Sequence, residues 1–152
     1  VNVSWMGEKM VIHHDIHIGV AVAVEEGLIV PVIRNTDQKS LLQIRDEIND
    51  KAERAKTRKL QLEEMQGNTF TISNLGMYDV DQFTAIINPP DACILAVGSI
   101  VKKPAVKADQ IIISNRMRLT LSCDHRAVDG ALGAKFLQSL KQILENPISL
   151  AL

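Results

Sequence analysis

The stretch Met117–Gly130, M-R-L-T-L-S-C-D-H-R-A-V-D-G, decides the fold of this chain. Alternate residues from Met117 to Cys123 are apolar, the pattern of a strand with one face on a core. Extending the alternation places His125 on the apolar side, where the strand gives way to a helix. An imidazole there is expected to be partly desolvated, which favours its neutral form and its use as a base. Spacing alone supports a core histidine bonded to a backbone carbonyl equally well.

Two helices are predicted from periodicity and caps. The last runs from Gly130 to about Glu145, and Asn146-Pro147 ends it. Asp129 stands directly before it, where aspartate is a good N-cap. Its apolar stripe consists of Leu132, Phe136, Leu137, Leu140 and Leu144.

The other helix begins with an S-x-x-Q capping box at Ser40 and Gln43. Its charge pairs Glu47–Lys51 and Asp50–Arg54 are expected on the solvated outer face. Its inner face is expected to carry Leu41, Ile44, Ile48, Ala52 and Ala55.

The remaining segments predict strands. Ile16–Val24 is almost continuously apolar, as expected of a strand buried on both faces. Leu28–Ile33 is a second strand in which Pro31 indicates an edge or a bulge. Further strands are expected at Thr69–Ser73, Cys93–Val101, Ile111–Ser114 and Met117–Cys123, the last two joined as a hairpin across Asn115-Arg116. These elements predict an α/β fold of the α+β type, a mixed β-sheet with helices on one side.

Composition narrows the classes of function. The 152 residues are 46% hydrophobic with a net charge of −1, so we expect one domain and no nucleic-acid partner. No apolar run approaches the roughly 20 residues of a membrane span. Cys93 and Cys123 are expected to be buried free thiols in a reducing compartment. Val1–Trp5 contains neither an initiator methionine nor a capping signal, so we expect that a piece of the parent protein precedes it.

Two side-chain groupings suggest other chemistry. His13, His14 and His17 invite a zinc interpretation, but on a strand His14 points away from the other two and no fourth ligand is evident, so no metal is expected. Cys123 shares a face with His125 and suggests a Cys–His nucleophile. A buried strand cysteine is the preferred interpretation.

Four ordered motifs carry a resemblance. D-H-R-A-V-D-G at Asp124–Gly130 resembles the signature of the dihydrolipoamide acyltransferase components of 2-oxo acid dehydrogenase complexes. Gly27–Val32, Thr69–Gly76, and Ile86–Pro90 followed by Ala96–Gly98 agree in order and spacing. The resemblance implies that residues 1–152 form a single domain, the C-terminal part of the acyltransferase catalytic domain. The N-terminal portion and the lipoyl and subunit-binding domains are not in this sequence.

The family resemblance implies a chloramphenicol acetyltransferase-like fold assembled as a trimer. Active sites would lie at subunit interfaces, in a channel entered by coenzyme A from one end and dihydrolipoamide from the other. His125 would be the general base, Ser73 the hydroxyl that hydrogen-bonds the oxyanion, and Asp129 a positioning residue whose arginine partner lies outside this sequence. We hypothesise that His125 and Ser73 of one site come from different chains. No phosphate-binding loop identifies the residues that contact coenzyme A.

The acyl group is expected to be acetyl. Asn74–Met77 and Phe83–Asn88 resemble the acetyltransferases of pyruvate dehydrogenase more than succinyl or branched-chain enzymes. Two departures from the family could alter the channel wall: Asn68 replaces the usual glycine, and Tyr78-Asp79 replaces an aromatic-glycine pair.

The resemblance also implies the assembly. Trimers would build a core of 24 or 60 subunits that works with lipoyl domains, the decarboxylase and dihydrolipoamide dehydrogenase, in the bacterial cytoplasm or the mitochondrial matrix. One alternative is a catalytically silent structural core or binding subunit of the same complex. Another is a free-standing acetyltransferase that acts on a small hydroxyl acceptor.

Overall fold

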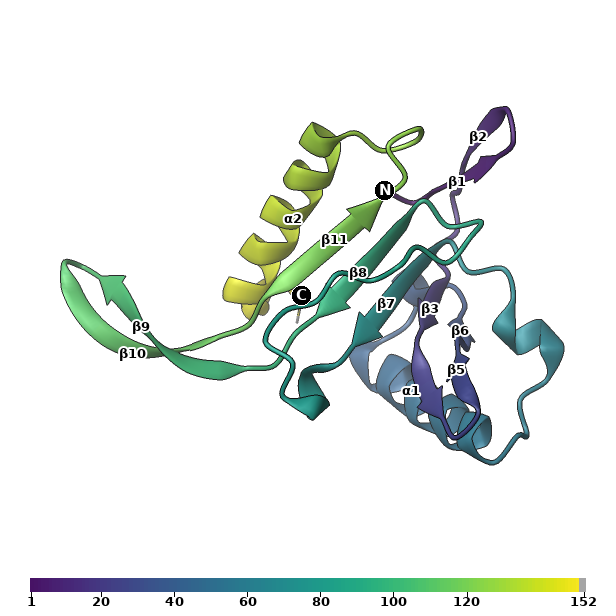
Figure 1. Cartoon of the computed structure of the whole chain (residues 1–152), viewed down its shortest axis with the longest axis horizontal. Helices are drawn as coiled ribbons and strands as arrows, with labels where there is room; N and C mark the ends of the chain where they lie inside the picture. The colour runs from purple at the N-terminus through teal and green to yellow at the C-terminus, as the bar shows by residue number, and fades with distance from the viewer. Residues whose placement is uncertain (151–152) are drawn as a thin grey trace.

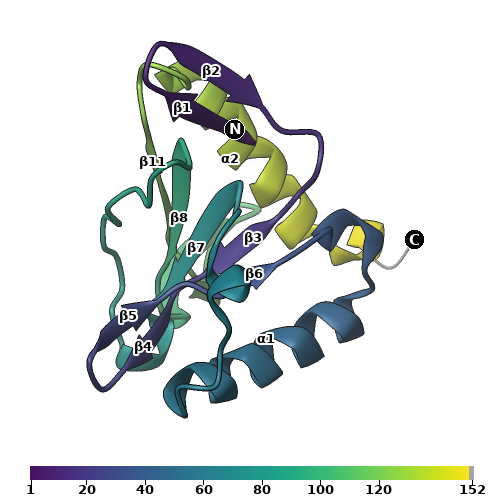
Figure 2. The same ribbon diagram turned by 90° about the vertical axis from the view of Figure 1, so that its right-hand side faces the viewer.

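The computed structural model describes residues 1–150. Its centre is a five-stranded mixed sheet with two long helices on one face (Figures 1 and 2). The sheet order is β11-β8-β7-β3-β6, and β7 runs parallel to both β3 and β8, whereas β11 and β6 are antiparallel to their neighbours. The bounds are β3 Ile18–Val20, β6 Val32–Ile33, β7 Phe70–Asn74, β8 Cys93–Val97 and β11 Leu119–Cys123. The predicted mixed sheet with helices on one side is confirmed.

The hydrophobic core lies between the sheet and α2 (Gly130–Glu145). Phe70 on β7 meets Phe136 on α2 with ring centroids 5.7 Å apart, within the range of favourable aromatic pairs. The buried cluster at this interface consists of Val3, Phe70, Ala92, Cys93, Leu95 and Val128. Of the predicted stripe on α2, Leu132 and Leu144 are exposed, so the apolar face of the helix is narrower than expected.

Helix α1 (Leu41–Lys56) packs near β4 and β6 and begins with the predicted capping box. Its inner face differs from the prediction: Leu41 is 63% exposed, whereas Lys51 is 8% exposed. The Lys51 ammonium donates to the carbonyl of Val32 at 2.5 Å and pairs with Glu47 at 2.7 Å. The long aliphatic stem of lysine can cover apolar surface while its charge finds partners, so the Glu47–Lys51 pair faces inward.

The apolar segment Ile16–Val24 is broken into two strands, contrary to the prediction of one doubly buried strand. β3 joins the main sheet, whereas β4 (Val22–Val24) pairs with β5 (Gly27–Ile29) in a separate ribbon that leaves Ala23 exposed. Pro31 lies between β5 and the edge strand β6, and its carbonyl accepts the Val20 amide at 2.9 Å. The predicted single strand Leu28–Ile33 is therefore broken at Pro31, which lies in neither strand but next to the edge strand β6.

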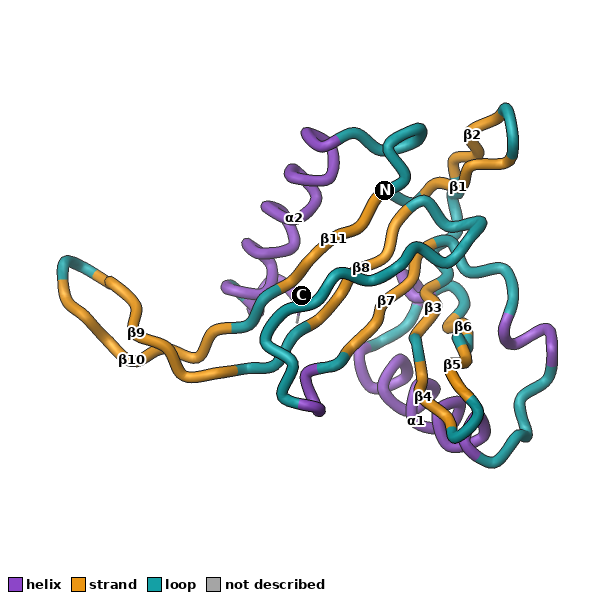
Figure 3. Tube along the Cα trace, in the orientation of Figure 1, coloured by secondary structure: helices purple, strands orange, loops and turns teal. Residues whose placement is uncertain are grey.

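The predicted hairpin across Asn115-Arg116 is wrong. β10 (Gln110–Arg116) pairs instead with β9 (Val101–Lys107), and the two form an arm that extends beyond the main sheet (Figures 1 and 3). The turn between them is Ala108-Asp109, with φ of 49° and 60°. Left-handed backbone at both central residues is typical of type I′ hairpin turns, which glycine and asparagine usually signal. Ala108 is not a residue type that signals such a turn, so the sequence did not predict a turn here.

The other elements are short. β1 (Val3–Met6) and β2 (Lys9–Ile12) form a hairpin above the sheet (Figure 2). Single 3-10 turns occur at Thr36–Gln38, Leu62–Met65, Gly76–Tyr78 and Pro147–Leu150. Among residues 1–150, no helix has both the length and the apolar character that a membrane crossing requires.

Candidate active site

His125 stands at the apex of a tight turn between β11 and α2. The Asp124 amide donates to the carbonyl of Ala92, the residue before β8, at 2.8 Å. The Asp124 carbonyl accepts the amides of Ala127 and Val128 at 3.0 and 2.9 Å. These bonds fix the backbone on both sides of His125, so the position of the imidazole is set by main-chain geometry.

An ion pair closes the same turn. The Asp124 carboxylate accepts the backbone amide of Arg126 at 3.0 Å and its guanidinium at 2.6–3.2 Å. Hydrogen bonds from Arg126 lower the pKa of Asp124 to about 2, so the ion pair persists to lower pH than it would with an ordinary aspartate. The guanidinium also lies 5.1 Å from the centre of the Trp5 ring, a cation–π distance. This Asp124–Arg126–Trp5 arrangement was not predicted, although the D-x-R spacing and the single tryptophan were visible signals of it in the sequence.

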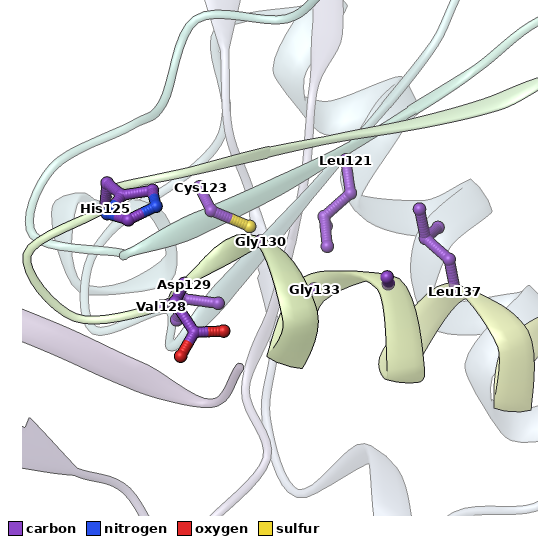
Figure 4. Close-up of a pocket in the computed structure, with 9 residues that line it drawn as sticks. Leu121, Cys123, His125, Val128, Asp129, Gly130, Gly133 and Leu137 are labelled. Atoms are coloured by element: carbon purple, nitrogen blue, oxygen red, sulfur yellow. The ribbon is translucent and has the colours of Figure 1, made fainter.

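His125 lines a cavity of about 280 Å³ (Figure 4). The wall is mostly apolar and small, formed by Leu121, Cys123, Val128, Asp129, Gly130, Gly133, Ala134 and Leu137. The strand alternation correctly placed His125 on the side of Leu121 and Cys123. The expected partial desolvation is wrong for this chain, because His125 is exposed. The alternative of a core histidine bonded to a backbone carbonyl is excluded by the same exposure.

Asp129 caps α2, as predicted. Its carboxylate accepts the amide of Leu132 at 2.8 Å, and its backbone is extended. Among residues 1–150, no arginine contacts this carboxylate. In this chain Asp129 therefore starts the helix and contributes to the cavity wall.

Ser73 lies far from His125 within one chain. It is half-buried on β7, level with Ala96 on β8 and Thr120 on β11. The end of β11 at Cys123 is three residues beyond Thr120, or roughly 10 Å at 3.3 Å per residue, and β7 is two strands, about 10 Å, to the side. The structure does not bring Ser73 and His125 together.

The two side chains also project from opposite faces of the sheet. Phe70 on β7 and Cys123 on β11 both face α2, as the Phe136 ring and the close approach of Gly133 show. Alternation then turns Ser73 to the face without helices. One hydroxyl and one imidazole of the same chain cannot act on one substrate in this arrangement.

The histidines nearer the N-terminus form no metal site. Residues 13–17 lie in the loop between β2 and β3 and not on a strand, contrary to the geometry assumed from the sequence. The His13 Nε2 atom is 2.7 Å from the Ser4 hydroxyl, and the His17 Nδ1 atom accepts the Asn35 amide at 3.0 Å. Within residues 1–150, no group of His, Cys, Asp and Glu side chains could hold a metal ion.

The two family departures have structural explanations. The Asn68 amide donates to Thr71 at 3.1 Å and to the buried carboxylate of Asp91 at 2.5 Å. Burial raises the pKa of Asp91, and the hydrogen bonds that its carboxylate accepts from the Thr71 hydroxyl, at 2.6 Å, and from Asn68 oppose that effect. Asp79 has a φ of 58°, the left-handed region that glycine adopts most easily. Neither change touches the His125 cavity.

Comparisons with known proteins agree over the whole chain. Residues 1–152 match the family model of the 2-oxoacid dehydrogenases acyltransferase (catalytic domain). The mitochondrial dihydrolipoyllysine-residue acetyltransferase component of the pyruvate dehydrogenase complex of Schizosaccharomyces pombe is 50% identical over 155 residues, covering 100% of this chain and 32% of that protein. The chain thus spans about a third of the curated relatives it matches.

Two solved structures share the fold. One is the dihydrolipoamide acetyltransferase (E2p) of Azotobacter vinelandii, studied for the roles of a serine, a histidine and an asparagine in its catalytic mechanism. It has a TM-score of 0.94 and 40% identity, over 99% of this chain and 63% of that one. The other is the cubic core of the pyruvate dehydrogenase multienzyme complex, with a TM-score of 0.94 and 39% identity over the same shares.

Proposed function

The chain belongs to the family of 2-oxoacid dehydrogenase acyltransferase catalytic domains, and from that premise we propose that it transfers an acetyl group between dihydrolipoamide and coenzyme A. One observation carries the proposal: an exposed imidazole, His125, held by a rigid turn at the edge of a small apolar cavity. Such a cavity suits the end of an acyl thioester. Both substrates are thiols or thioesters, and the lipoyl group would be carried on a separate domain of the parent protein.

The chemistry needs a base because a free thiol, with a pKa near 8.5, is only a few per cent ionised at neutral pH. A histidine is a base of suitable strength there. His125 would take the proton of the attacking thiol, whose sulfur then bonds to the thioester carbon. The resulting oxyanion would accept a hydrogen bond from the Ser73 hydroxyl. Collapse breaks the old carbon–sulfur bond, and the leaving thiolate recovers the proton from His125.

A working site would combine two chains. Ser73 and His125 of one chain lie at different ends and on opposite faces of the sheet, so each would meet the complementary residue of a neighbour. A cyclic trimer provides this contact with closed symmetry, since one surface of each subunit meets a different surface of the next. We extend the proposal to a homotrimer with shared sites.

The proposed residues also match a relative in order and interval. In the Azotobacter vinelandii enzyme the serine, histidine and asparagine under study are separated by the same intervals as Ser73, His125 and Asp129 here. Aspartate therefore stands where that enzyme has asparagine. Both residue types are good N-caps, which supports a positioning role for Asp129 through α2.

The β9–β10 arm supports assembly. Val106, Ile111 and Ile113 lie on one face of it and are 72%, 81% and 81% exposed. An apolar face of this kind on a projecting ribbon is typical of a surface that another subunit covers. We propose a neighbouring copy as that subunit, with trimers forming a 24-mer or 60-mer core. The similar pyruvate dehydrogenase complex has a cubic core, which supports assembly into a core of this kind.

The proposed partners are lipoyl domains, the decarboxylase and dihydrolipoamide dehydrogenase. The proposed location is the bacterial cytoplasm, with the mitochondrial matrix as the alternative. Similar proteins support both locations, because the Azotobacter vinelandii enzyme is bacterial and the Schizosaccharomyces pombe protein is mitochondrial.

An acceptor assay tests the function. The purified protein is given acetyl-coenzyme A with dihydrolipoamide, or with a small hydroxyl acceptor. Transfer to dihydrolipoamide that disappears in His125→Ala is the expected result. Transfer only to the hydroxyl acceptor indicates a free-standing acetyltransferase, and no transfer by a protein that assembles normally indicates a silent structural core.

A further inference from the structure

Two free thiols face each other at the base of the His125 turn. Cys93 on β8 and Cys123 on β11 are direct partners in the antiparallel ladder, and the Cys93 thiol donates to the Cys123 sulfur across 3.5 Å. Cys93 is fully buried, whereas Cys123 is half-buried and lines the cavity beside His125 (Figure 4). The proposed transfer uses neither thiol.

The ladder brings these residues as close as a sheet allows. Hydrogen bonds from Asp124 to Ala92 at 2.8 Å and from Gly98 to Arg118 at 3.0 Å mark the hydrogen-bonded pairs of β8 and β11. Pair types alternate, so Cys93 and Cys123 form a non-hydrogen-bonded pair, in which facing Cα atoms lie about 4.5 Å apart. That spacing is at the short end of the range that disulfides span, roughly 4.4–6.8 Å.

We propose that Cys93 and Cys123 are an oxidisable dithiol, which a low-molecular-weight disulfide converts into a reversible cross-strand disulfide. The sulfur atoms would need to approach from 3.5 Å to about 2.05 Å, a movement that side-chain rotation and a small backbone shift can supply. The short Cα spacing strains the bond, and strained disulfides are the more easily reduced ones. The pair is therefore suited to reversible oxidation.

The order of steps follows from burial. Cys123 attacks one sulfur of the small disulfide, which releases one small thiol and leaves a mixed disulfide on Cys123. Cys93 then attacks the Cys123 sulfur and releases the second small thiol. Two protein thiols and one small disulfide thus become one protein disulfide and two small thiols. Burial raises the pKa of Cys93 to about 12, so Cys93 is the poorer first nucleophile and the ring closure is slow.

The disulfide would affect the turn that holds His125. Cys123 directly precedes Asp124, whose amide bonds to Ala92 beside Cys93. Drawing the two sulfurs together changes this end of the strand pair and the cavity wall. A slower acetyl transfer in the oxidised form is expected, and this part alone rests on the proposed function.

The direct test is peptide mapping after oxidation. The native protein, purified under reducing conditions, is treated with oxidised glutathione, quenched with N-ethylmaleimide and digested with trypsin. We expect a disulfide link between two tryptic peptides, Leu119–Arg126 with Cys123 and Leu60–Lys102 with Cys93. Dithiothreitol or dihydrolipoamide should remove this link. Full N-ethylmaleimide labelling of both cysteines after treatment would overturn the proposal, as would a glutathione adduct that remains on Cys123 while Cys93 stays free.

The variant Cys93→Ala separates the two steps. It should accumulate the glutathione adduct on Cys123, whereas an unmodified Cys123 in this variant contradicts the proposed order. In the acetyl-transfer assay, protein shown to be cross-linked should display a lag while dihydrolipoamide reduces it, whereas the same protein kept fully reduced should not. A cross-linked protein without a lag refutes the effect on the turn but leaves the disulfide itself established.

Discussion

The two halves of the proposed site are built in different ways. The half that contains His125 is local in sequence. The Asp124–Arg126 ion pair and the helix cap Asp129 all lie within four residues of the imidazole. The Ser73 half is non-local, because the position of Ser73 depends on the pairing of β7 with β3 and β8. The two halves occupy different ends of the same sheet.

This difference indicates what one chain can do alone. The local half presents its base without help from another subunit. The Ser73 hydroxyl faces away from that base and would act only on a substrate held by a neighbour's His125. A single chain therefore carries both halves of the proposed site, but the two halves do not form one complete site. Substitutions in the two halves should lower activity for different reasons.

Replacing His125 by alanine should have the largest effect. General-base catalysis typically contributes ~10²–10⁴-fold, so kcat for acetyl transfer should fall by at least about 10²-fold. The matched control is His14→Ala, an exposed histidine in the loop before β3, which should keep wild-type kcat. A folded His125→Ala protein with unchanged kcat removes His125 from the mechanism.

Ser73→Ala should come next. Loss of one oxyanion donor typically costs ~10²–10³-fold in kcat, with little change in substrate KM if the hydroxyl acts mainly in the transition state. Ser114→Ala on the exposed arm is the control for serine removal. A rise in KM at constant kcat would instead assign Ser73 to ground-state binding.

Substitutions of Asp129 test the positioning role. Asp129→Ala removes the N-cap of α2 and should lower the free energy of unfolding by about 1 kcal/mol in thermal or urea denaturation. Asp129→Asn should preserve both stability and activity, because asparagine caps equally well. Normal stability with lost activity in Asp129→Asn would show that the charge itself contributes to catalysis.

The smallest effect is expected at Cys123. Direct transfer needs only the two substrate thiols, so Cys123→Ser should retain most of the activity under reducing conditions. Mass spectrometry after incubation with acetyl-coenzyme A alone should find no acetylated protein. A stable acetyl adduct on Cys123 contradicts direct transfer.

The sequence predicted the local half better than the non-local one. The capping residue Asp129, the bounds of α2 and the side of the strand on which His125 lies all follow from neighbours within a few residues. The exposure of His125 could not be predicted, because strand alternation defines a face but not what covers the residues beyond the strand end.

Pairing errors arose where local signals were weak. Ala108-Asp109 lacks the glycine that usually marks a tight hairpin, so the strands around Asn115 were joined incorrectly. Charge alone placed Lys51 outside, but the carbonyl of Val32 and the carboxylate of Glu47 hold it inside. The Asn68–Asp91 bond joins residues far apart in sequence and leaves no local signal.

The central claim, that Ser73 and His125 act across chains, is tested by reassembling mixed oligomers. Ser73→Ala and His125→Ala proteins are unfolded, mixed in equal amounts and refolded, and wild type is mixed with the double variant as the control. Shared sites in a cyclic trimer predict about a quarter of wild-type activity in both mixtures, because half of the chains supply each intact residue at random. If each site lay within one chain, the mixture of single variants would show no more activity than the single variants themselves. The mixture of wild type with the double variant would then show about half of wild-type activity, and that pair of results would contradict the account.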